Sequence, residues 1–409
     1  MKDIKSEVTK KMWLLVVVAA LGYFVDVYDL LLFSAVRTTS LADIGVSSAD
    51  SLQVGLKLLN WQMSGLMIGA VCWGMLGDKK GRLAVLFGSI ITYSIANLLN
   101  AYVQTVEQYQ WLRLFSGIGL AGELGAGITL IAEVMPKEKR GIGTTIIGSF
   151  GLLGAAVASA IGLEMGWRTA FTVGGVMGLA LLVLRLGVSE SKLFEALRHK
   201  HVVRGNIFLL FKKPSRFVRL LICVLVGLPV YFIVGLLITG APQFGKALGV
   251  NPVPKAGIAV MLAYIGMSIG DVLCGIISQF LKSRKKALLV FAIMSGVTIA
   301  IFLFVPTTDL TLFYWKCGLV GFGVGYWALI NTNTAEQFGT NVRATVATLS
   351  PNLIRASLIP IAASFNAIKG DLGLFPTAVA VGAFCVVVSI VSTLSLKETF
   401  GADLDYNEE

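Results

Sequence analysis

Long runs of apolar residues alternate with short polar segments along the whole chain. Each run is about 20 residues long or slightly longer, which is the length that an α-helix needs to cross a bilayer. Because only helices satisfy the backbone in many spans of this length, the pattern predicts an all-α membrane protein. Twelve membrane helices are expected, at roughly 12–36, 56–76, 83–103, 109–135, 141–163, 167–188, 217–240, 256–281, 286–306, 312–336, 344–368 and 374–396.

The longest polar segment, residues 189–216, separates six predicted helices from the other six. The sequence therefore predicts an N-terminal bundle at 1–188 and a C-terminal bundle with a short tail at 217–409. The segment between them is basic, and we expect it to lie at the membrane surface, where contact with anionic lipid is one interpretation of its charge.

The composition agrees with a membrane protein. The 409 residues are 56% hydrophobic and 14% charged, whereas soluble domains carry about 25% charged residues. The net charge of +11 alone would suit a nucleic-acid-binding protein. The bases instead lie in short loops between apolar runs, so nucleic acid is not an expected partner.

No metal site, disulfide or cofactor site is expected. The five cysteines all lie in apolar runs without a pairing pattern, and the only histidines, His199 and His201, lie in the polar central segment. The basic start of the chain before an apolar run resembles a signal peptide. Because that run is too long and contains Asp26 and Asp29, it is instead predicted to be the first membrane helix.

Lysine and arginine mark one side of the predicted membrane topology. Loops on the cytoplasmic side of membrane proteins carry an excess of both residues, so both termini are expected to be cytoplasmic. The bases on this side include Lys2, Lys5, Lys10, Lys11, Lys79, Lys80, Arg82, Lys137, Lys139, Arg140, Lys282, Arg284, Lys285, Lys286, Arg343 and Lys397.

The two halves contain a degenerate internal sequence repeat. Glu133 precedes Arg140 by seven residues, and Glu336 precedes Arg343 by the same spacing, at an offset of 336 − 133 = 203. Two similar halves in parallel are a plan found in transporters, with the substrate site at their interface.

The loop at residues 74–82 carries the most specific motif. It reads Gly-Met-Leu-Gly-Asp-Lys-Lys-Gly-Arg, and its acid is Asp78. A basic loop of any membrane protein would look similar, but this stretch resembles the Gly-x-Leu-x-Asp-Arg-x-Gly-Arg motif of the major facilitator superfamily. The runs beginning at Arg113, Glu133, Gly166, Ser189 and Lys397 also look like signatures of this family.

The resemblance points to one branch, which holds sugar porters, phosphate/proton symporters, organic-ion carriers and metabolite/proton symporters. The first helix, around residues 22–30, looks most like the phosphate and metabolite symporters. The resemblance implies two six-helix bundles with the substrate between them. A proline motif typical of drug/proton antiporters is missing from 148–154, which counts against drug exchange.

Residues 117–122 fit the dinucleotide-binding pattern Gly-x-Gly-x-x-Gly. They lie inside an apolar helix and follow no strand, so the context that this motif requires is absent. Close packing of helices through small residues is the better interpretation.

Several ionisable residues fall at bilayer depth, where charge is costly and usually functional. Asp26 and Asp29 share one face of the first helix, and Arg113 lies at a compatible height. One guanidinium cannot fully compensate two carboxylates, so one acid is expected to bind a proton readily. The predicted proton-coupling residues are Asp26, Asp29, Glu123 and Arg113, with a static ion pair of Arg113 and one aspartate as the alternative.

Arg355 lies at mid-depth in the predicted helix at 344–368. A permanent cation with a fork of donors suits a carboxylate or phosphate substrate. A salt bridge to Asp271 or Asp26 would be the structural alternative. The predicted substrate-binding residues are Arg355, Asn352, Gln62, Tyr231, Trp327, Asn331 and Asp271.

Further charged residues flank the helices on the cytoplasmic side. We expect them to form latches between helices, as a cytoplasmic gate, rather than to contact substrate. They are Asp78, Arg82, Glu133, Arg140, Glu336 and Arg343.

The sequence therefore predicts a secondary transporter of the cell membrane and no enzyme. Proton-coupled symport of a small anion by a monomer is favoured, the anion being an organic carboxylate or phosphate. A sugar or polyol carrier, or an uncoupled organic-ion facilitator, remains open. A non-transporting nutrient receptor with a facilitator fold is the alternative from another class.

Overall fold

The computed structural model describes residues 2–47, 50–136, 140–184, 213–402 and 408, and every regular element among them is helical. Most of the predicted linker at 189–216 lies outside these ranges. The helices are α1 (Lys2–Asp43), α2 (Ser51–Lys80), α3 (Arg82–Asn100), α4 (Val106–Leu120), α5 (Glu123–Val134), α6 (Arg140–Glu164), α7 (Trp167–Leu184), α10 (Pro214–Leu225), α11 (Leu228–Tyr231), the π-helix η2 (Phe232–Ile238), α12 (Ala241–Ala247), α13 (Ala256–Phe280), α14 (Arg284–Phe304), α15 (Leu310–Gly323), α16 (Trp327–Glu336), α17 (Arg343–Ala356), α18 (Leu358–Leu372) and α19 (Leu374–Ser395).

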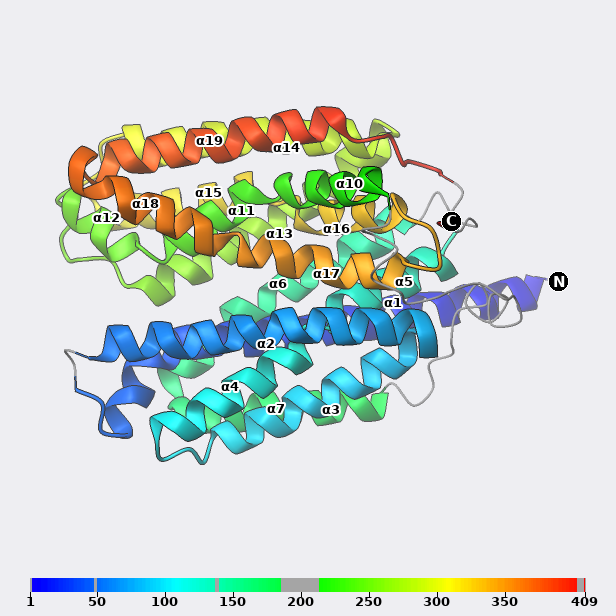
Figure 1. Cartoon of the computed structure of the whole chain (residues 1–409), viewed down its shortest axis with the longest axis horizontal. Helices are drawn as coiled ribbons and strands as arrows, with labels where there is room; N and C mark the ends of the chain where they lie inside the picture. Colours follow the sequence, from blue (N-terminus) through cyan, green and yellow to red (C-terminus); the bar gives the residue numbers. More distant parts are fainter. Residues whose placement is uncertain (1, 48–49, 137–139, 185–212, 403–407, 409) are drawn as a thin grey trace.

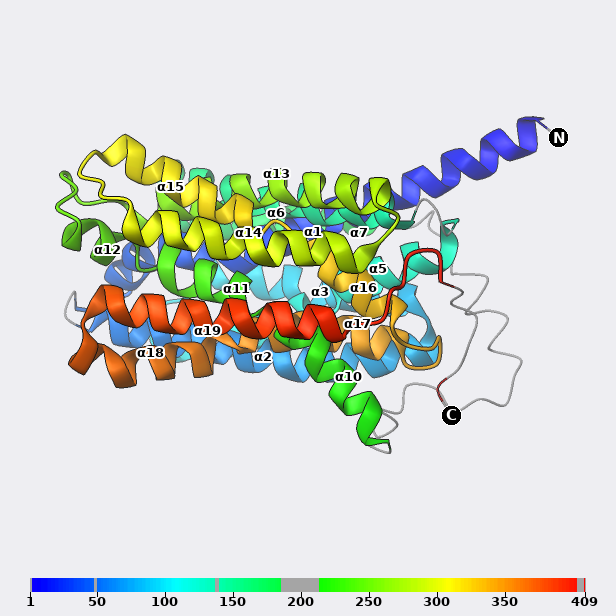
Figure 2. The ribbon, with the colours of Figure 1, turned by 90° about the horizontal axis from the view of Figure 1, so that it is seen from above.

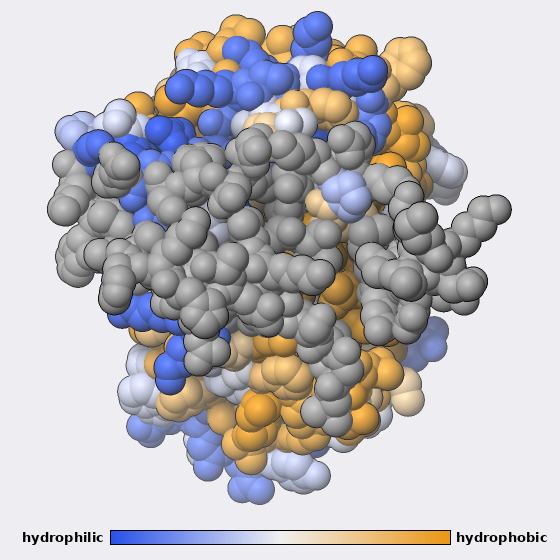
Figure 3. Space-filling view, turned by 90° about the vertical axis from the view of Figure 1, so that its right-hand side faces the viewer, coloured by the Kyte–Doolittle hydropathy of each residue, from blue (hydrophilic) through white to orange (hydrophobic). Residues whose placement is uncertain are grey.

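The helices run roughly along one long axis and form two groups (Figures 1 and 2). Helices α1–α7 make up the first half, and α10–α19 make up the second. Both chain termini lie at the same end of the molecule, which we call the termini end (Figure 1). Seen from that end, hydrophilic residues of the described chain gather in groups around the rim (Figure 3).

Eight helices of the described chain are long and apolar enough to cross a membrane, or nine if the bent pair at Pro214–Ile238 is one span. The other three predicted spans are also helical, but differ from the pattern in instructive ways. The 30-residue α2 ends in Asp78, Lys79 and Lys80. The predicted spans at 109–135 and 312–336 are each broken into two short helices, α4–α5 and α15–α16.

The two breaks occupy equivalent places in the two halves. Helix α4 ends at Leu120 and α15 ends at Gly323, a separation of 323 − 120 = 203 positions, which is the offset of the sequence repeat. Glycine lies within or directly beside both breaks, at Gly122 and Gly325, and glycine has a low helix propensity.

The predicted span at 217–240 is bent by 40°. Pro229 lies in the first turn of α11, where its missing N–H would otherwise be needed to continue α10. The chain then continues as the π-helix η2, a form that appears in proteins mostly as short insertions into α-helices.

Small residues bring neighbouring helices of the first half into backbone contact. A Cβ added to Gly117 would lie 2.2 Å from the backbone oxygen of Gln62, and one added to Gly119 would lie 2.5 Å from the backbone nitrogen of Tyr93. These glycines therefore allow close helix packing, as predicted for residues 117–122.

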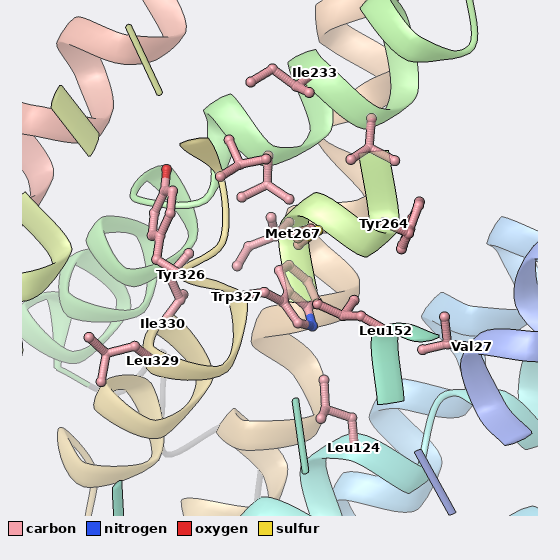
Figure 4. Packing of buried hydrophobic residues seen from close by; sticks show 14 of the residues in the cluster. Val27, Leu124, Leu152, Ile233, Tyr264, Met267, Tyr326, Trp327, Leu329 and Ile330 are labelled. Atoms are coloured by element: carbon pink, nitrogen blue, oxygen red, sulfur yellow. The ribbon is translucent and has the colours of Figure 1, made fainter. Parts of the chain in front are cut away.

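The interface between the halves is what positions the candidate site. Helix α6 packs against α13, and α17 packs against both α2 and α5. We call this interface the seam. Its hydrophobic centre contains side chains from α1, α6, α13 and α16, including Val27, Leu152, Met267 and Trp327 (Figure 4).

Candidate functional site

The seam is tightly closed at the termini end, where α2 meets α17. The Asp78 carboxylate accepts hydrogen bonds from the backbone N–H of Thr345 at 2.9 Å and from its hydroxyl at 2.6 Å. Thr345 lies in the first turn of α17, where Val342 supplies no side-chain cap. Asp78 therefore satisfies a helix N-terminus of the opposite half, with its negative charge at the positive end of the helix dipole.

Gly74 makes this approach possible, because a Cβ added there would lie 2.8 Å from the Cα of Thr345. The other edge of the seam is similarly close. A Cβ on Gly275 of α13 would lie 2.2 Å from the Thr145 hydroxyl of α6, and one on Gly141 would lie 2.4 Å from a guanidinium nitrogen of Arg284.

The remaining predicted gate residues are placed as follows. Glu336 lies 3.4 Å from Arg284 in a buried ion pair and accepts a hydrogen bond from the Thr399 hydroxyl at 2.8 Å. Buried Arg343 donates to the backbone oxygen of Ala335 at 3.2 Å. The side chains of Arg82, Glu133 and Arg140 lie outside the described part of the chain.

A small buried cavity lies farther along the seam, between the two halves. Its volume is about 20 Å³, which is room for about one water molecule. A substrate of several heavy atoms does not fit, so this conformation is closed around the site. The cavity is lined by Tyr23, Val27, Leu30, Leu152, Val230, Tyr231, Val234, Tyr264, Met267, Trp327 and Arg355.

Arg355 is the permanent cation of this cavity and is buried in the last turn of α17. One terminal nitrogen donates to the Asn352 side-chain oxygen at 3.0 Å, while Nε has no hydrogen-bond partner among the described residues. The guanidinium carbon lies 5.9 Å from the centre of the Trp327 ring, within cation–π range. Tyr231 stands 6.0 Å from the same ring, centre to centre.

Two hydrogen bonds tie the cavity to the first half. The Trp327 indole donates to the Tyr23 hydroxyl at 2.7 Å. The Asn352 amide nitrogen lies 3.3 Å from the backbone oxygen of Ala121, which the break between α4 and α5 leaves accessible. The arginine is thus linked through Asn352 to the opposite half.

Asp26 and Asp29 of α1 are both fully buried. Asp26 interacts electrostatically with Tyr23, Tyr231 and Arg355, three residues that line the cavity. Asp29 interacts instead with Arg113 and with Asp26.

No direct ion pair forms between Asp29 and Arg113 in the described structure. Arg113 donates to Ser116 at 3.0 Å and lies 5.5 Å and 5.3 Å from the rings of Phe33 and Phe171. Two of its nitrogens and both oxygens of Asp29 lack hydrogen-bond partners among the described residues. The static ion pair, which was the alternative interpretation, is therefore not seen between Arg113 and Asp29. The cation instead lies between two aromatic rings, with the acid in electrostatic range.

The structure does not bring the other predicted site residues into the cavity. Gln62 is buried away from it, and the Asn331 amide donates to the backbone oxygen of Trp327 at 2.8 Å. Asp271 accepts from the backbone N–H of Ala328 at 3.1 Å, so it caps the start of α16 at the second break. Glu123 is buried at the start of α5, next to the first break.

Sequence reasoning missed Tyr23 as a site residue. It precedes Asp26 by three positions, so it faces the same side of α1, and this spacing was an available signal. Tyr264 was not among the predicted site residues either, and it lines the cavity.

Comparison with known proteins agrees with this architecture. The chain is 26% identical to the cis,cis-muconate transport protein of Acinetobacter baylyi over 93% of each chain. It is 27% identical to the niacin transporter of the same organism over 80% of each.

Among solved structures, the proton:xylose symporter XylE in complex with 6-bromo-6-deoxy-D-glucose superposes with a TM-score of 0.77 at 16% identity, covering 97% of this chain and 98% of XylE. Identity this low shows the fold alone.

The sequence pattern described as the Major Facilitator Superfamily matches residues 12–359, most of the chain. That match runs through both halves and the seam between them, and it is a pattern of transporters rather than of enzymes. The chain therefore belongs to the major facilitator superfamily, as a multi-pass membrane transporter.

Proposed function

We propose that this transporter is a proton-coupled symporter of a small, flat organic carboxylate. One observation carries the proposal: a buried arginine, Arg355, faces an aromatic cavity on the seam with part of its donor capacity unused. A buried cation without a carboxylate in direct contact is costly, so an anionic ligand would stabilise it.

The walls of the cavity favour a conjugated ring or chain over a compact polar anion. Tyr23, Tyr231, Tyr264 and Trp327 line the cavity together with Arg355. Planar π-systems pack against such rings, whereas inorganic phosphate would leave them without an apolar partner. The names of two relatives agree with this chemistry, because niacin and cis,cis-muconate are both conjugated carboxylates.

The charges around the cavity give a physical route to proton coupling. Without substrate, Asp26 is the acid that interacts electrostatically with Arg355. A substrate carboxylate would compete with Asp26 for the same cation, and the displaced carboxylate would then be stabilised by binding a proton. Substrate anion and proton would thus be carried together. Asp29 is assigned to Arg113, with which it interacts electrostatically.

Transport requires the closed cavity to open toward each side in turn. We assign the termini end to the cytoplasm, because Lys79, Lys80, Lys282, Lys285 and Lys286 all lie there. The contacts of Asp78 and Gly74 would then close the cytoplasmic side of the seam.

Calorimetric titration of the purified protein with niacin, benzoate, cis,cis-muconate, xylose and phosphate tests the proposal. Wild type should bind at least one carboxylate, and Arg355→Ala should weaken that binding by 30-fold or more, by roughly the 2 kcal/mol or more that a charge-assisted hydrogen bond contributes. Arg168→Ala is the matched control, since Arg168 pairs with Asp43 at 3.0 Å on the protein surface. Unchanged affinity in folded, monodisperse Arg355→Ala would reject the assignment.

Proteoliposome uptake of the bound carboxylate, with and without an inward proton gradient, tests the coupling separately. Accumulation should need the gradient. Equal uptake with and without the gradient would mean that the protein is an uncoupled facilitator of the same anion, not a symporter.

A further inference from the structure

A cluster of basic residues opens α10, the first helix of the second half. Lys213 precedes the helix, and Arg216 and Arg219 lie in its first two turns. Positive charge at a helix N-terminus is unfavourable, because the helix dipole is positive there. Arg216 is also buried, with 3% of its side chain exposed. This cluster therefore calls for a carboxylate or a similar anion.

Glu408 supplies that carboxylate. One of its oxygens lies 3.0 Å from Nε of Arg216, and the other lies 2.9 Å from a terminal nitrogen of Arg219. The acid is only 8% exposed, and the Arg219 guanidinium lies 5.1 Å from the ring centre of Phe338. Each carboxylate oxygen thus meets a separate arginine.

The backbone of Glu408 is recognised as well. The Asn341 amide nitrogen donates to the backbone oxygen of Glu408 at 2.9 Å, and the Asn341 oxygen accepts from its backbone N–H at 2.9 Å. A side-chain amide that grips both backbone groups of one residue recognises an extended peptide rather than a free ion. The site is built mainly from buried groups, because Asn341 itself is 1% exposed.

The location of this site connects it to the seam. Asn341 belongs to the turn between α16 and α17, and Arg219 also donates to the backbone oxygen of Gln337 in that turn at 2.9 Å. Thr345, the residue whose N–H and hydroxyl meet Asp78 of the other half, follows Asn341 by four positions. Occupying the site fixes the turn from which the seam contact starts.

We propose that Arg216, Arg219 and Asn341 form a peptide-carboxylate site whose ligand is Glu408 of the same chain, and that its occupancy holds the termini end closed. We call it the tail site. When Glu408 is bound, the turn before α17 is held where Thr345 reaches Asp78. When Glu408 leaves, its contacts with the two arginines and Asn341 are lost and the turn is released, so the closed form loses stability relative to the open one.

Distance measurements between spin labels test this on the full chain in lipid nanodiscs. The five native cysteines are replaced by serine, and labels are attached at Lys80→Cys in the first half and Lys286→Cys in the second. Both lysines are exposed at the termini end. Opening of this end lengthens the label distance, so the ratio of long to short distances reports the equilibrium.

Glu408→Gln should raise that ratio at least threefold, and Arg216→Gln should do the same. The double variant should raise it no further than the larger single change, since Arg216→Gln removes an ion pair that Glu408→Gln already removes. Asp371→Asn, which neutralises an exposed acid elsewhere in the second half, should leave the ratio unchanged. Should Arg216→Gln not fold, the more exposed Arg219→Gln takes its place.

Unchanged distance distributions in Glu408→Gln and in the arginine variant would overturn the proposal. That holds even if the melting temperature falls, because the contact would then stabilise the fold without biasing the conformation. Additive shifts in the double variant would equally overturn it, since they would mean that the two residues act through separate contacts.

Discussion

Replacing Gly74 by alanine should open the termini end of the transporter. The added Cβ would lie 2.8 Å from the Cα of Thr345, while ordinary contact begins at 3.4 Å, so α2 and α17 must separate by about 3.4 − 2.8 = 0.6 Å to restore ordinary contact. The obstructing atom belongs to the backbone, and no change of rotamer relieves the overlap. Helices α2 and α17 must therefore move apart along their contact.

The same displacement weakens the hydrogen bonds of Asp78. Its bond to the Thr345 N–H is 2.9 Å long, and 0.6 Å more would bring it to 3.5 Å, the limit of a useful interaction. Overpacking of this kind costs about 1–3 kcal/mol. Because the cost falls only on the closed form, the open-to-closed ratio should rise about 5- to 150-fold.

The spin-label pair at Lys80 and Lys286 measures this ratio directly. Gly318→Ala is the matched control, because it also adds a methyl group inside a helix but meets nothing closer than 3.7 Å. Alanine favours a helix over glycine by up to about 1 kcal/mol, equally in the open and closed forms, so this gain cancels in the ratio. A distance distribution in Gly74→Ala that matches wild type and Gly318→Ala would refute the argument.

Three further predictions concern the charged residues. Asp78→Asn removes the charge at the start of α17 and should shift the same label equilibrium toward the open form about tenfold, or about 1.4 kcal/mol; normal uptake with weakened substrate binding would contradict its assignment to the gate. Arg355→Lys keeps the cation but loses the fork, so the Kd for a carboxylate should rise about tenfold or more, by roughly the net value of one charge-assisted hydrogen bond; an unchanged Kd would show that only charge matters. Asp26→Asn should abolish accumulation driven by a pH gradient while counterflow of substrate survives. If Asp26→Asn, Asp29→Asn and Glu123→Gln all retain accumulation, proton coupling through these acids is excluded.

The fold was predictable because bilayer length and apolar content leave few choices for the backbone. The predicted first span at 12–36 lies inside α1, and its membrane-spanning part runs over Trp13–Arg37. What the pattern did not reveal is where helices break. The breaks at Ala121 and Val324 lie inside predicted spans that contain no proline, and they depend on groups elsewhere in the chain, such as the Asp271 carboxylate that caps α16.

The candidate site was predicted in part. Arg355, Tyr231 and Trp327 all line the cavity, and an ionisable residue at bilayer depth usually faces one. Asp271 belongs to a cap, which sequence spacing cannot distinguish from a ligand, because its partner is a backbone N–H 57 positions away. An ion pair of Arg113 with one aspartate was the alternative suggested by their compatible height, and height does not account for the aromatic rings that lie beside the arginine.

The paired breaks in α4–α5 and α15–α16 bear on how such a transporter can change over evolutionary time. At the first break, the backbone oxygen of Ala121 accepts a hydrogen bond from Asn352 of the opposite half. At the second break, the backbone N–H of Ala328 donates to the Asp271 carboxylate. Backbone groups persist whatever side chains surround them. Substitutions at cavity positions such as Val27, Leu152 or Met267 therefore alter the shape offered to a ligand while these joints stay intact. A lineage can exchange one substrate for another by drift in its cavity lining, without rebuilding the machinery that moves it.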